Sequence, residues 1–410
     1  MTKLSKGPAA AAFGRRRFLA TGAMATGALL AAPSILRAST GDLKIGWLRP
    51  LTGPLASSFE SLYAAGDIAL EEINAKGGIL GRKLVKVEVD DAGAPANQPI
   101  AVRQLIEDDI NIVVGPVGSS QTLAALAVAT PAGIIQSGYI TASEGGDGAR
   151  YPYHYQCGFT VATQAVKYAE YLSTKTPHKN IGVLVEDSAA GTSVLEACKV
   201  ELAKAGLNLV ASRVSPLRSP DLTPFLRDLR SSGAEALCAF VSNAIDVTQF
   251  FVGLDRLGWK PPVVGHTGLV FATAPNAVPD SAKYPEVYAA SYKGLTFTDA
   301  DQPTERVRAF VTKLARLNLP DSSLPPAATS PYYDFLHVVA HAAEATQSLK
   351  SDDLKAYLDK LTGYEGLYGP MSFTPGNHTG YGPDAAAMAQ VFAPASELMT
   401  TSRGLFRPRG

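Results

Sequence analysis

A run of glycine and hydroxyl side chains follows a strongly apolar stretch in the first third of the chain. The apolar stretch, residues 110–114, is typical of a buried strand, and residues 123–129 are typical of a helix. Between them lies Gly-Pro-Val-Gly-Ser-Ser-Gln-Thr, residues 115–122, which contains Ser119 and Ser120. Free backbone N–H groups at a helix start, together with nearby hydroxyls, can hold a carboxylate. The pattern predicts an anion site, and the alternative is that a serine only caps the helix.

A second polar segment follows the next predicted strand. Residues 133–135 read Gly-Ile-Ile, and residues 137–143 read Ser-Gly-Tyr-Ile-Thr-Ala-Ser, which we interpret as a loop. The carboxyl ends of neighbouring parallel strands lie at the same edge of a sheet, so both polar segments can face one ligand. Tyr139, Phe59 and Phe159 could stack on a ring of that ligand, or they could fill the core.

The sequence lacks the short motifs of common cofactor and catalytic sites. It contains no G-x-G-x-x-G after a strand, no P-loop, no G-x-S-x-G, no H-E-x-x-H and no cysteine pair with zinc spacing. His337 and His341 lie four residues apart on a predicted helix, but no third ligand is near them in the sequence. We therefore expect no metal, no cofactor and no catalytic residues.

Strand-like and helix-like segments alternate along two stretches of the chain. In the first, we expect strands at 43–48, 85–89, 110–114 and 133–135, and helices at 60–76, 96–108 and 123–129. In the second, we expect strands at 181–185, 207–214, 236–241 and 261–265, and helices at 163–174, 194–205, 222–231 and 247–257. This order predicts an α/β fold of two doubly wound parallel-sheet lobes, whose strand ends can face a shared cleft.

The last third of the chain contains too little strand for a third sheet. We expect one strand at 294–298 and helices at 304–317, 331–349 and 352–361. These segments should return to the first two sheets, so that several chain crossings form a hinge. The expected lobes are residues 42–158 with about 294–365, and residues 159–293 with about 366–410.

The first 38 residues have the composition of an export signal. They contain no acidic residue and six basic ones, namely Lys3, Lys6, Arg15, Arg16, Arg17 and Arg37. Arg-Arg-Arg-Phe-Leu at 15–19 precedes an apolar run at 20–36, a pattern that resembles a twin-arginine signal. The alternative is a membrane anchor, but the run is short and contains glycine and proline. We expect cleavage near Ala38, a periplasmic mature chain and no stable membrane insertion.

The remainder of the chain is net acidic. The 410 residues include 37 basic and 37 acidic ones, so removal of the six basic residues above leaves a net charge of −6. Such a surface repels nucleic acid and anionic lipid, and we expect neither as a partner. The three cysteines, Cys157, Cys198 and Cys238, lie in apolar surroundings and are expected to be buried structural residues.

Several stretches together carry a resemblance to a known family. The most specific is Ile-Asn-Ala-Lys-Gly-Gly-Ile-Leu-Gly at 73–81, and the supporting stretches are 44–46, 51–54, 89–92, 114–116 and 368–373. The chain resembles the substrate-binding proteins of ABC importers, in the leucine/isoleucine/valine-binding family with the type I periplasmic binding fold. The resemblance covers essentially all of the mature chain. It implies a monomer with two hinged lobes that closes on a small solute and delivers it to an inner-membrane ABC permease.

The resemblance also implies positions for the ligand contacts. In this family a Ser, a Thr and backbone N–H groups hold the solute carboxylate, and these positions fall on Ser119 and on Thr141 with Ala142. The acid that pairs with an α-ammonium group would stand at Thr267, although Asp246 lies nearby in the sequence. The expected contacts are Phe59, Ser119, Ser120, Tyr139, Thr141, Ala142, Phe159, Ala190, Asn243 and Thr267.

The missing acid broadens the expected solutes. A buried ammonium without a counter-charge is costly, so aromatic acids and other organic acids without an ammonium group join branched-chain and other hydrophobic amino acids as candidates. Two further functions fit the same features. One is a ligand-binding module that feeds a sensor or receptor. The other is a two-lobed enzyme, against which the lack of a nucleophile–base pair argues.

Overall fold

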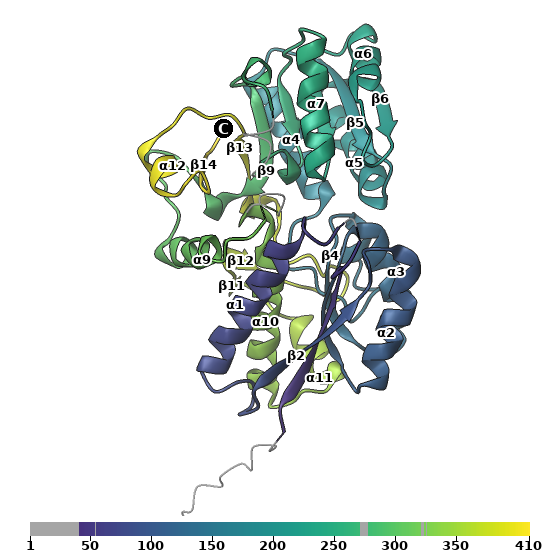
Figure 1. The fold of residues 1–410 in the computed structure, drawn as a ribbon, viewed down its shortest axis with the longest axis vertical. Helices are drawn as coiled ribbons and strands as arrows, with labels where there is room; N and C mark the ends of the chain where they lie inside the picture. The colour runs from purple at the N-terminus through teal and green to yellow at the C-terminus, as the bar shows by residue number, and fades with distance from the viewer. Residues whose placement is uncertain (1–40, 54, 271–277, 321–323, 325) are drawn as a thin grey trace, which may run out of the picture. The chain divides into compact units, whose positions relative to one another are not determined.

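Two main β-sheets organise the protein, one of four strands and one of six, as the computed structural model shows (Figure 1). The structure describes residues 41–53, 55–270, 278–320, 324 and 326–410. The expected signal peptide, residues 1–38, lies outside them. Within the described residues, no helix combines the length and apolar character needed to cross a lipid bilayer.

The first sheet is parallel and has the strand order β2-β1-β3-β4. Its strands are β1 (Leu43–Arg49), β2 (Leu84–Asp90), β3 (Ile112–Val117) and β4 (Ile135–Tyr139). Its connecting helices are α1 (Glu60–Ala75), α2 (Gln98–Glu107) and α3 (Ser119–Ala129). Consecutive side chains of a strand point to opposite faces, so Trp47 packs toward α1 while Leu48 joins a separate core with Leu105 of α2. Both faces of the sheet are therefore covered.

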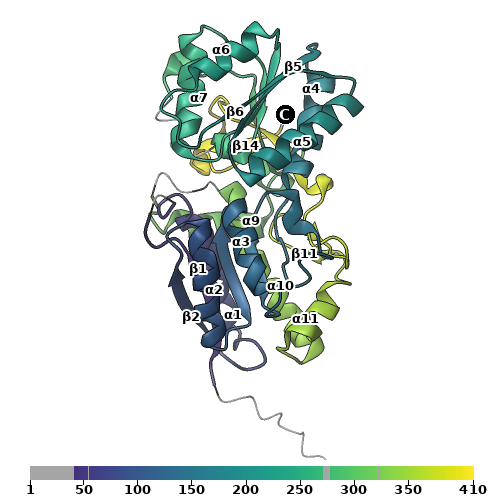
Figure 2. The same ribbon diagram turned by 90° about the vertical axis from the view of Figure 1, so that its right-hand side faces the viewer.

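The second sheet has the strand order β13-β9-β8-β7-β5-β6 and is parallel except for β13, which pairs antiparallel with β9. Its strands are β5 (Asn180–Glu186), β6 (Asn208–Ser215), β7 (Ala236–Phe240), β8 (Val263–Gly265), β9 (Val287–Tyr292) and β13 (Ala386–Gln390). The helices α4 (Val161–Lys175) and α5 (Ala189–Lys204) pack together, as do α6 (Thr223–Ser231) and α7 (Ala244–Arg256) (Figure 2). The predicted α/β class with two mostly parallel sheets is confirmed.

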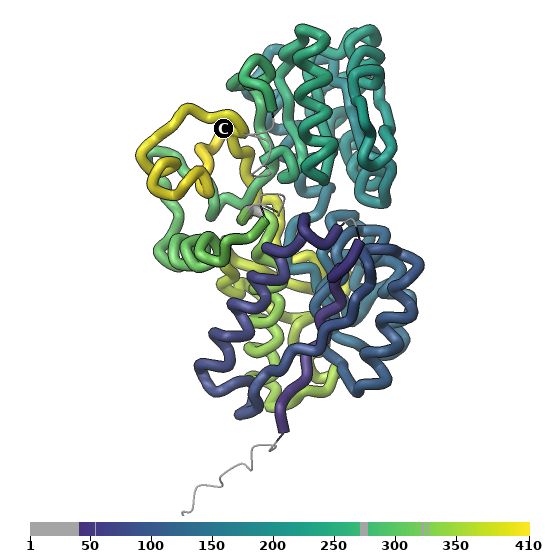
Figure 3. Tube along the Cα trace, in the orientation of Figure 1, coloured from purple at the N-terminus to yellow at the C-terminus, as the bar shows by residue number. Residues whose placement is uncertain are grey.

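The last third of the chain adds elements to both sheets. Helix α10 (Ser330–Thr346) packs along α1, and the two run side by side in Figure 3, whereas β13 completes an edge of the second sheet. The remaining helices are α9 (Glu305–Ala315), α11 (Ser351–Leu358) and α12 (Glu397–Thr401). Two small sheets pair β10 (Thr296–Phe297) with β14 (Arg407–Pro408), and β11 (Tyr364–Glu365) with β12 (Pro370–Met371). The residue boundaries of the two lobes stay a prediction.

Three expectations about elements were wrong. Residues 137–139 belong to β4 and are not a loop, because the backbone of β4 continues to pair with β3 as far as Tyr139. The strand expected at 294–298 is reduced to β10, which lies outside the second sheet. The real strands of this region, β9 and β13, were missed, because they are rich in alanine and owe their extended form to pairing with each other.

Candidate functional site

A glycine joins the end of β3 to the start of α3. Gly118 has a φ of +96°, and a Cβ atom there would lie 2.2 Å from Oε1 of Gln121. Its N–H donates to the carbonyl of Tyr139 at 2.9 Å, which ties the ends of β3 and β4 together. Because Gly118 has no side chain, no side-chain cap closes the start of α3 in the described structure. The first N–H groups of this helix therefore keep their capacity to bind an acceptor.

Ser119 meets the segment that follows β4. Its Oγ atom accepts hydrogen bonds from the backbone N–H groups of Thr141, at 3.3 Å, and Ala142, at 3.2 Å. Ser119 and Ala142 are buried, whereas Thr141 is half-buried. The structure thus brings together the hydroxyl and the two amides that the sequence analysis assigned to a carboxylate.

A small cavity is lined by Thr141, whereas Ser119 and Ala142, which adjoin Thr141, do not line it. Its volume is about 20 Å³, enough for a single water molecule and far below the roughly 300–1,000 Å³ of typical ligand pockets. It is lined by Gly138, Tyr139, Ile140, Thr141, Gln156, Gly158, Phe159, His266, Thr267, Tyr292, Ala328 and Pro331. Residues from the ends of β4, β8 and β9 thus meet here, so both sheets contribute to its walls. A solute can enter only if these walls separate.

Two polar atoms of the cavity residues lack partners. Thr267 is 3% exposed, and its buried side-chain oxygen, Oγ1, has no hydrogen-bond partner among the described residues. The same holds for Oε1 of Gln156, also 3% exposed, whose Nε2 donates to the carbonyl of Ile140. Buried polar atoms in native proteins are usually paired, so these two atoms indicate that the cavity receives a polar group.

His266 contributes a neutral ring to the same wall. Its Nδ1 lies 3.0 Å from Oε1 of Gln164, an oxygen that only accepts, so Nδ1 carries the proton and Nε2 is an acceptor. Burial lowers the pKa of His266 to about 3, which keeps the ring uncharged at neutral pH. Of the described residues that line the cavity, none is Asp, Glu, Lys or Arg. The cavity therefore offers hydrogen bonds without a formal charge.

Aromatic rings form the apolar part of the cavity. The rings of Phe159 and Tyr292 have centroids 4.5 Å apart, and the ring of Phe59 packs on Tyr139 at 5.9 Å. Phe59 does not line the cavity itself, but Tyr139, which its ring contacts, does. Burial raises the pKa of both Tyr139 and Tyr292, so their hydroxyls stay protonated.

Of the ten expected contacts, Tyr139, Thr141, Phe159 and Thr267 line the cavity, Phe59, Ser119 and Ala142 contact or adjoin a lining residue, and three others lie elsewhere. Ser120 follows Ser119 in α3 but does not line the cavity, and Ala190 lies in the first turn of α5. Asn243 caps α7: its side-chain oxygen accepts from the N–H of Asp246 at 3.0 Å. Asp246, considered as a substitute acid, accepts through Oδ2 from the side chain of Asn243 and from the N–H of Arg218. The ligand roles of Ser120, Ala190 and Asn243 stay predictions.

The sequence analysis missed several cavity residues. Gln156, His266 and Tyr292 are the polar ones among them, and Gln156 is more than 100 residues away from the other two in the sequence. The signal for Gln156 was a polar residue inside the apolar run Tyr-Gln-Cys-Gly-Phe at 155–159. No comparable local signal marks Tyr292, since its strand was not recognised.

A buried histidine holds the segment that carries the two amides. Nε2 of His154 accepts from the N–H of Gly138 at 3.1 Å, and its Nδ1 lies 2.8 Å from the carbonyl of Gly145 and donates to it. Burial lowers the pKa of His154 to about 4, so the ring is neutral and can play both roles. His154 thereby fixes both ends of residues 138–145.

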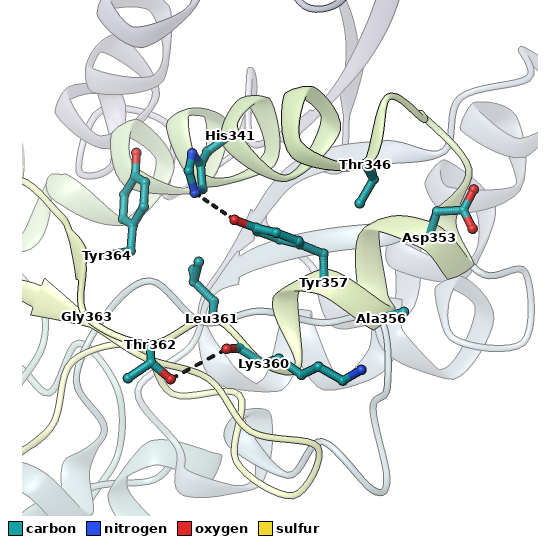
Figure 4. A pocket seen from close by; sticks show the side chains of 10 residues that line it. All are labelled: His341, Thr346, Asp353, Ala356, Tyr357, Lys360, Leu361, Thr362, Gly363 and Tyr364. Carbon is teal, nitrogen blue, oxygen red and sulfur yellow. Dashed lines mark hydrogen bonds between the residues drawn. The ribbon is translucent and has the colours of Figure 1, made fainter.

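A larger hollow lies between α10, α11 and β11 (Figure 4). It measures about 1030 Å³, and within it Nε2 of His341 pairs with the hydroxyl of Tyr357 at 2.9 Å. The other histidine of the predicted helix, His337, has its Nε2 3.4 Å from Oε2 of Glu72. The two imidazoles thus face different groups, and no group of three or more potential metal ligands occurs among the described residues.

A protein-family model described as "Periplasmic binding protein" matches residues 42–394. Among curated proteins, Leu/Ile/Val-binding protein homolog 7 of Brucella suis biovar 1 (strain 1330) is 31% identical over 265 residues, which cover 62% of this chain and 65% of the relative. Leu/Ile/Val-binding protein BraC3 of Rhizobium johnstonii is 30% identical over 46% of this chain and 51% of its own length. The chain thus spans less than two thirds of these relatives.

Solved structures share the fold at lower identity. A periplasmic binding protein type 1 from Bordetella pertussis Tohama I has a TM-score of 0.76 and 20% identity, covering 87% of this chain and 98% of that one. A branched-chain amino acid transporter substrate-binding protein from Streptococcus pneumoniae, in complex with isoleucine, has a TM-score of 0.70 and 22% identity, covering 85% and 96%. A solute-binding protein of an ABC transporter from R. palustris, in complex with 4-hydroxybenzoate, has a TM-score of 0.72 and 18% identity, covering 87% and 94%.

Proposed function

The chain belongs to the periplasmic binding protein family, and from this premise we propose that it is the solute-binding component of an ABC importer. It captures a small carboxylate-bearing solute in the periplasm and presents it to an inner-membrane permease, without converting it chemically. The export signal at residues 1–38 and its cleavage near Ala38 are part of this proposal. The observation that carries it is the meeting of Ser119 with the amides of Thr141 and Ala142, beside a cavity whose walls come from both sheets.

The carboxylate of the solute takes over hydrogen bonds that the protein makes to itself. The N–H groups of Thr141 and Ala142 donate to the Ser119 hydroxyl in the structure described here. A carboxylate is a stronger acceptor than a hydroxyl, because hydrogen bonds to a charged group are shorter and stronger. When it binds to these amides, the Ser119 hydroxyl turns from acceptor to donor and adds a further bond. The uncapped start of α3 also favours a negative charge at this place.

Contact with both walls couples binding to closure. Tyr139 ends β4 of the first sheet and Thr141 follows it, whereas Tyr292 ends β9 of the second sheet and Thr267 follows β8. A solute that touches residues of both sheets binds the closed form more tightly than the open form, and it therefore shifts the population toward closure. A direct contact already joins the segment after β4 of the first sheet to helix α5 of the second, because Oγ of Ser193 in α5 accepts a hydrogen bond from the N–H of Ser143 at 3.1 Å.

The solute belongs to the hydrophobic amino acids or to the organic acids without an ammonium group. The names of the curated relatives support the first class, since they are Leu/Ile/Val-binding proteins. The solved structures with 4-hydroxybenzoate and 3,4-dihydroxy benzoic acid support the second. The apolar rings of Phe159 and Tyr292 fit the hydrophobic part of either class.

Calorimetric titration of a double variant tests the proposal. A thermal-shift screen against amino acids and aromatic acids first identifies a ligand, which at 100 times its Kd should add about 2.7 kcal/mol of stability. The variant Ser119→Ala with Thr141→Ala removes the two side-chain hydroxyls that we assign to the carboxylate, that of Thr141 from the family resemblance, so its affinity should fall at least about 100-fold. The matched control is Ser173→Ala with Thr174→Ala, whose hydroxyls bond only to the carbonyl of Glu170 in α4. Equal affinity of the double variant and this control would reject the proposed site.

A further inference from the structure

Two polar atoms of the cavity, one amide oxygen and one hydroxyl, have no partner among the described residues, and a third residue presents an acceptor. Oε1 of Gln156 can only accept, and the amide nitrogen of the same side chain is engaged with Ile140. Nε2 of His266 is an acceptor, because Nδ1 of that ring donates to Gln164. The Thr267 hydroxyl is unpaired and can either donate or accept. Of these atoms, Oε1 of Gln156 can be satisfied only by a hydrogen-bond donor.

The buried acids at this edge of the second sheet bond to other groups, although Oδ1 of Asp246 has no hydrogen-bond partner among the described residues. Glu186, at the end of β5, accepts from the N–H and hydroxyl of Ser242 and from the hydroxyl of Ser188. Asp246, in the first turn of α7, accepts from Asn243 and from the N–H of Arg218. Neither acid lines the cavity. An ammonium group placed here would find neutral acceptors only, and a buried charge without a counter-charge is unfavourable.

We propose that Gln156, His266 and Thr267 receive an uncharged hydroxyl, so that the solute is a hydroxy acid and not an α-amino acid. This inference rests on the proposed function, because it assumes that Ser119, Thr141 and Ala142 hold the carboxylate. Thr267 is then a specificity-determining residue. An acidic side chain at this position would favour a solute with an ammonium group, whereas the Thr267 hydroxyl does not. A hydroxyl is both donor and acceptor, so it can donate to Gln156 or His266 while it accepts from Thr267.

Pairs of solutes that differ only in whether they carry the hydroxyl group test the inference. One pair is L-leucine and L-2-hydroxy-4-methylpentanoate, in which a hydroxyl replaces the ammonium group. The other is 4-hydroxybenzoate and benzoate, in which the hydroxyl is absent. We expect calorimetry on the full chain to show that the hydroxylated member of at least one pair binds about 10-fold or more tightly than its partner. The variant Thr267→Val, which replaces the hydroxyl by a methyl group, should reduce this preference below about 3-fold, whereas Thr267→Ser should retain it.

A charge-introducing variant and the earlier double variant separate the possible failures. Thr267→Glu supplies the missing counter-charge and should shift the preference toward L-leucine. If the unaltered protein prefers L-leucine to its hydroxy analogue and benzoate to 4-hydroxybenzoate, the inference is wrong. The proposed function nevertheless stands if Ser119→Ala with Thr141→Ala still weakens binding at least about 100-fold. If no carboxylate binds, or if that double variant binds as well as the unaltered protein, the proposed function fails together with the inference.

Discussion

The hydroxyl oxygen of Ser119 accepts a hydrogen bond from the backbone N–H of Ala142 at 3.2 Å, and so the start of α3 is fastened to the segment that follows β4. The two residues follow neighbouring strands of one parallel sheet, which is why residues 23 positions apart can meet. The contact positions the proposed carboxylate donors before any solute arrives. It also makes their geometry depend on how closely β4 approaches α3.

The approach of β4 to α3 requires a glycine at position 138. A Cβ atom at Gly138 would lie 2.4 Å from Cγ2 and 2.6 Å from Oγ1 of Thr122. We expect Gly138→Ala to displace the end of β4, to lower the free energy of unfolding by about 1–3 kcal/mol and to weaken solute binding. Urea unfolding and calorimetry measure the two effects. Gly382→Ala is the control, because a Cβ atom at Gly382 meets nothing within 4 Å. Similar stability of the two variants would show that the close approach is unimportant.

His154 should make the protein less stable in weak acid. Burial lowers its pKa to about 4 in the folded chain, against about 6.5 when unfolded, so the unfolded state binds more protons between these values. The contribution of neutral His154 to the free energy of unfolding is therefore fully present above pH 6.5 and is lost as the pH falls toward 4. The variant His154→Gln leaves the N–H of Gly138 or the carbonyl of Gly145 poorly paired, so we expect it to be less stable by about 1–3 kcal/mol at pH 7.

The gap between the unaltered protein and His154→Gln should shrink as the pH falls from 7 to 4.5, because only the histidine titrates. Chemical unfolding at each pH measures the gap. His341→Gln serves as a control, since His341 is exposed and bonds to Tyr357. A gap that stays constant with pH would show that His154 is not held neutral by its surroundings.

Asp334 should produce the opposite pH dependence. Burial raises its pKa to about 7, although hydrogen bonds from the hydroxyl of Tyr381 and the N–H of Leu367 oppose this. The folded state then binds more protons than the unfolded state between pH 4 and 7, so stability falls as the pH rises through this range. We expect Asp334→Asn, measured by urea unfolding, to gain roughly 3 kcal/mol relative to the unaltered protein between pH 5 and 8. A pH-independent difference would contradict a raised pKa.

The three cysteines should be unreactive in the folded protein. Cys157, Cys198 and Cys238 are all buried as free thiols. Burial raises the pKa of Cys157, and a hydrogen bond with Cys198 together with burial raises that of Cys238. Because the thiolate is the reactive form, an aromatic disulfide reagent should label no thiol rapidly in buffer and all three in guanidinium. Rapid labelling of a native thiol would show that one of them becomes exposed.

Local sequence patterns were sufficient for most elements of the fold. Regular apolar spacing located α1 and α4, and continuous apolar runs located β5 and β7, because these signals depend on residues close in sequence. The strand β13 has the sequence Ala-Ala-Met-Ala-Gln, which has no preference for an extended backbone. Its conformation is imposed by pairing with β9, a partner about 100 residues away. Such an element cannot be recognised without knowledge of that partner.

The candidate site was predictable on one side only. Ser119 and Thr141 follow two neighbouring strands, and the rule that parallel strands present their ends at one edge brought them together. The opposite wall depends on how β8 and β9 meet the first part of the chain, and no local pattern encodes this. His266 was missed for this reason, whereas Gln156 was marked only by its place as a polar residue in the apolar run 155–159. Thr267 was found only through the family resemblance.

The packing of α10 on α1 and the pairing of β13 with β9 have a consequence for biosynthesis. Both sheets are completed by residues from the last fifth of the chain. Helix α10 packs on α1 beside the first sheet, and β13 forms an edge of the second. Contacts between such distant segments form only after most of the polypeptide has left the ribosome. A nascent chain that stops before Ala386 exposes the unpaired edge of β9, which is open to association with other strands. Maturation of this protein is therefore a late, largely post-translational event.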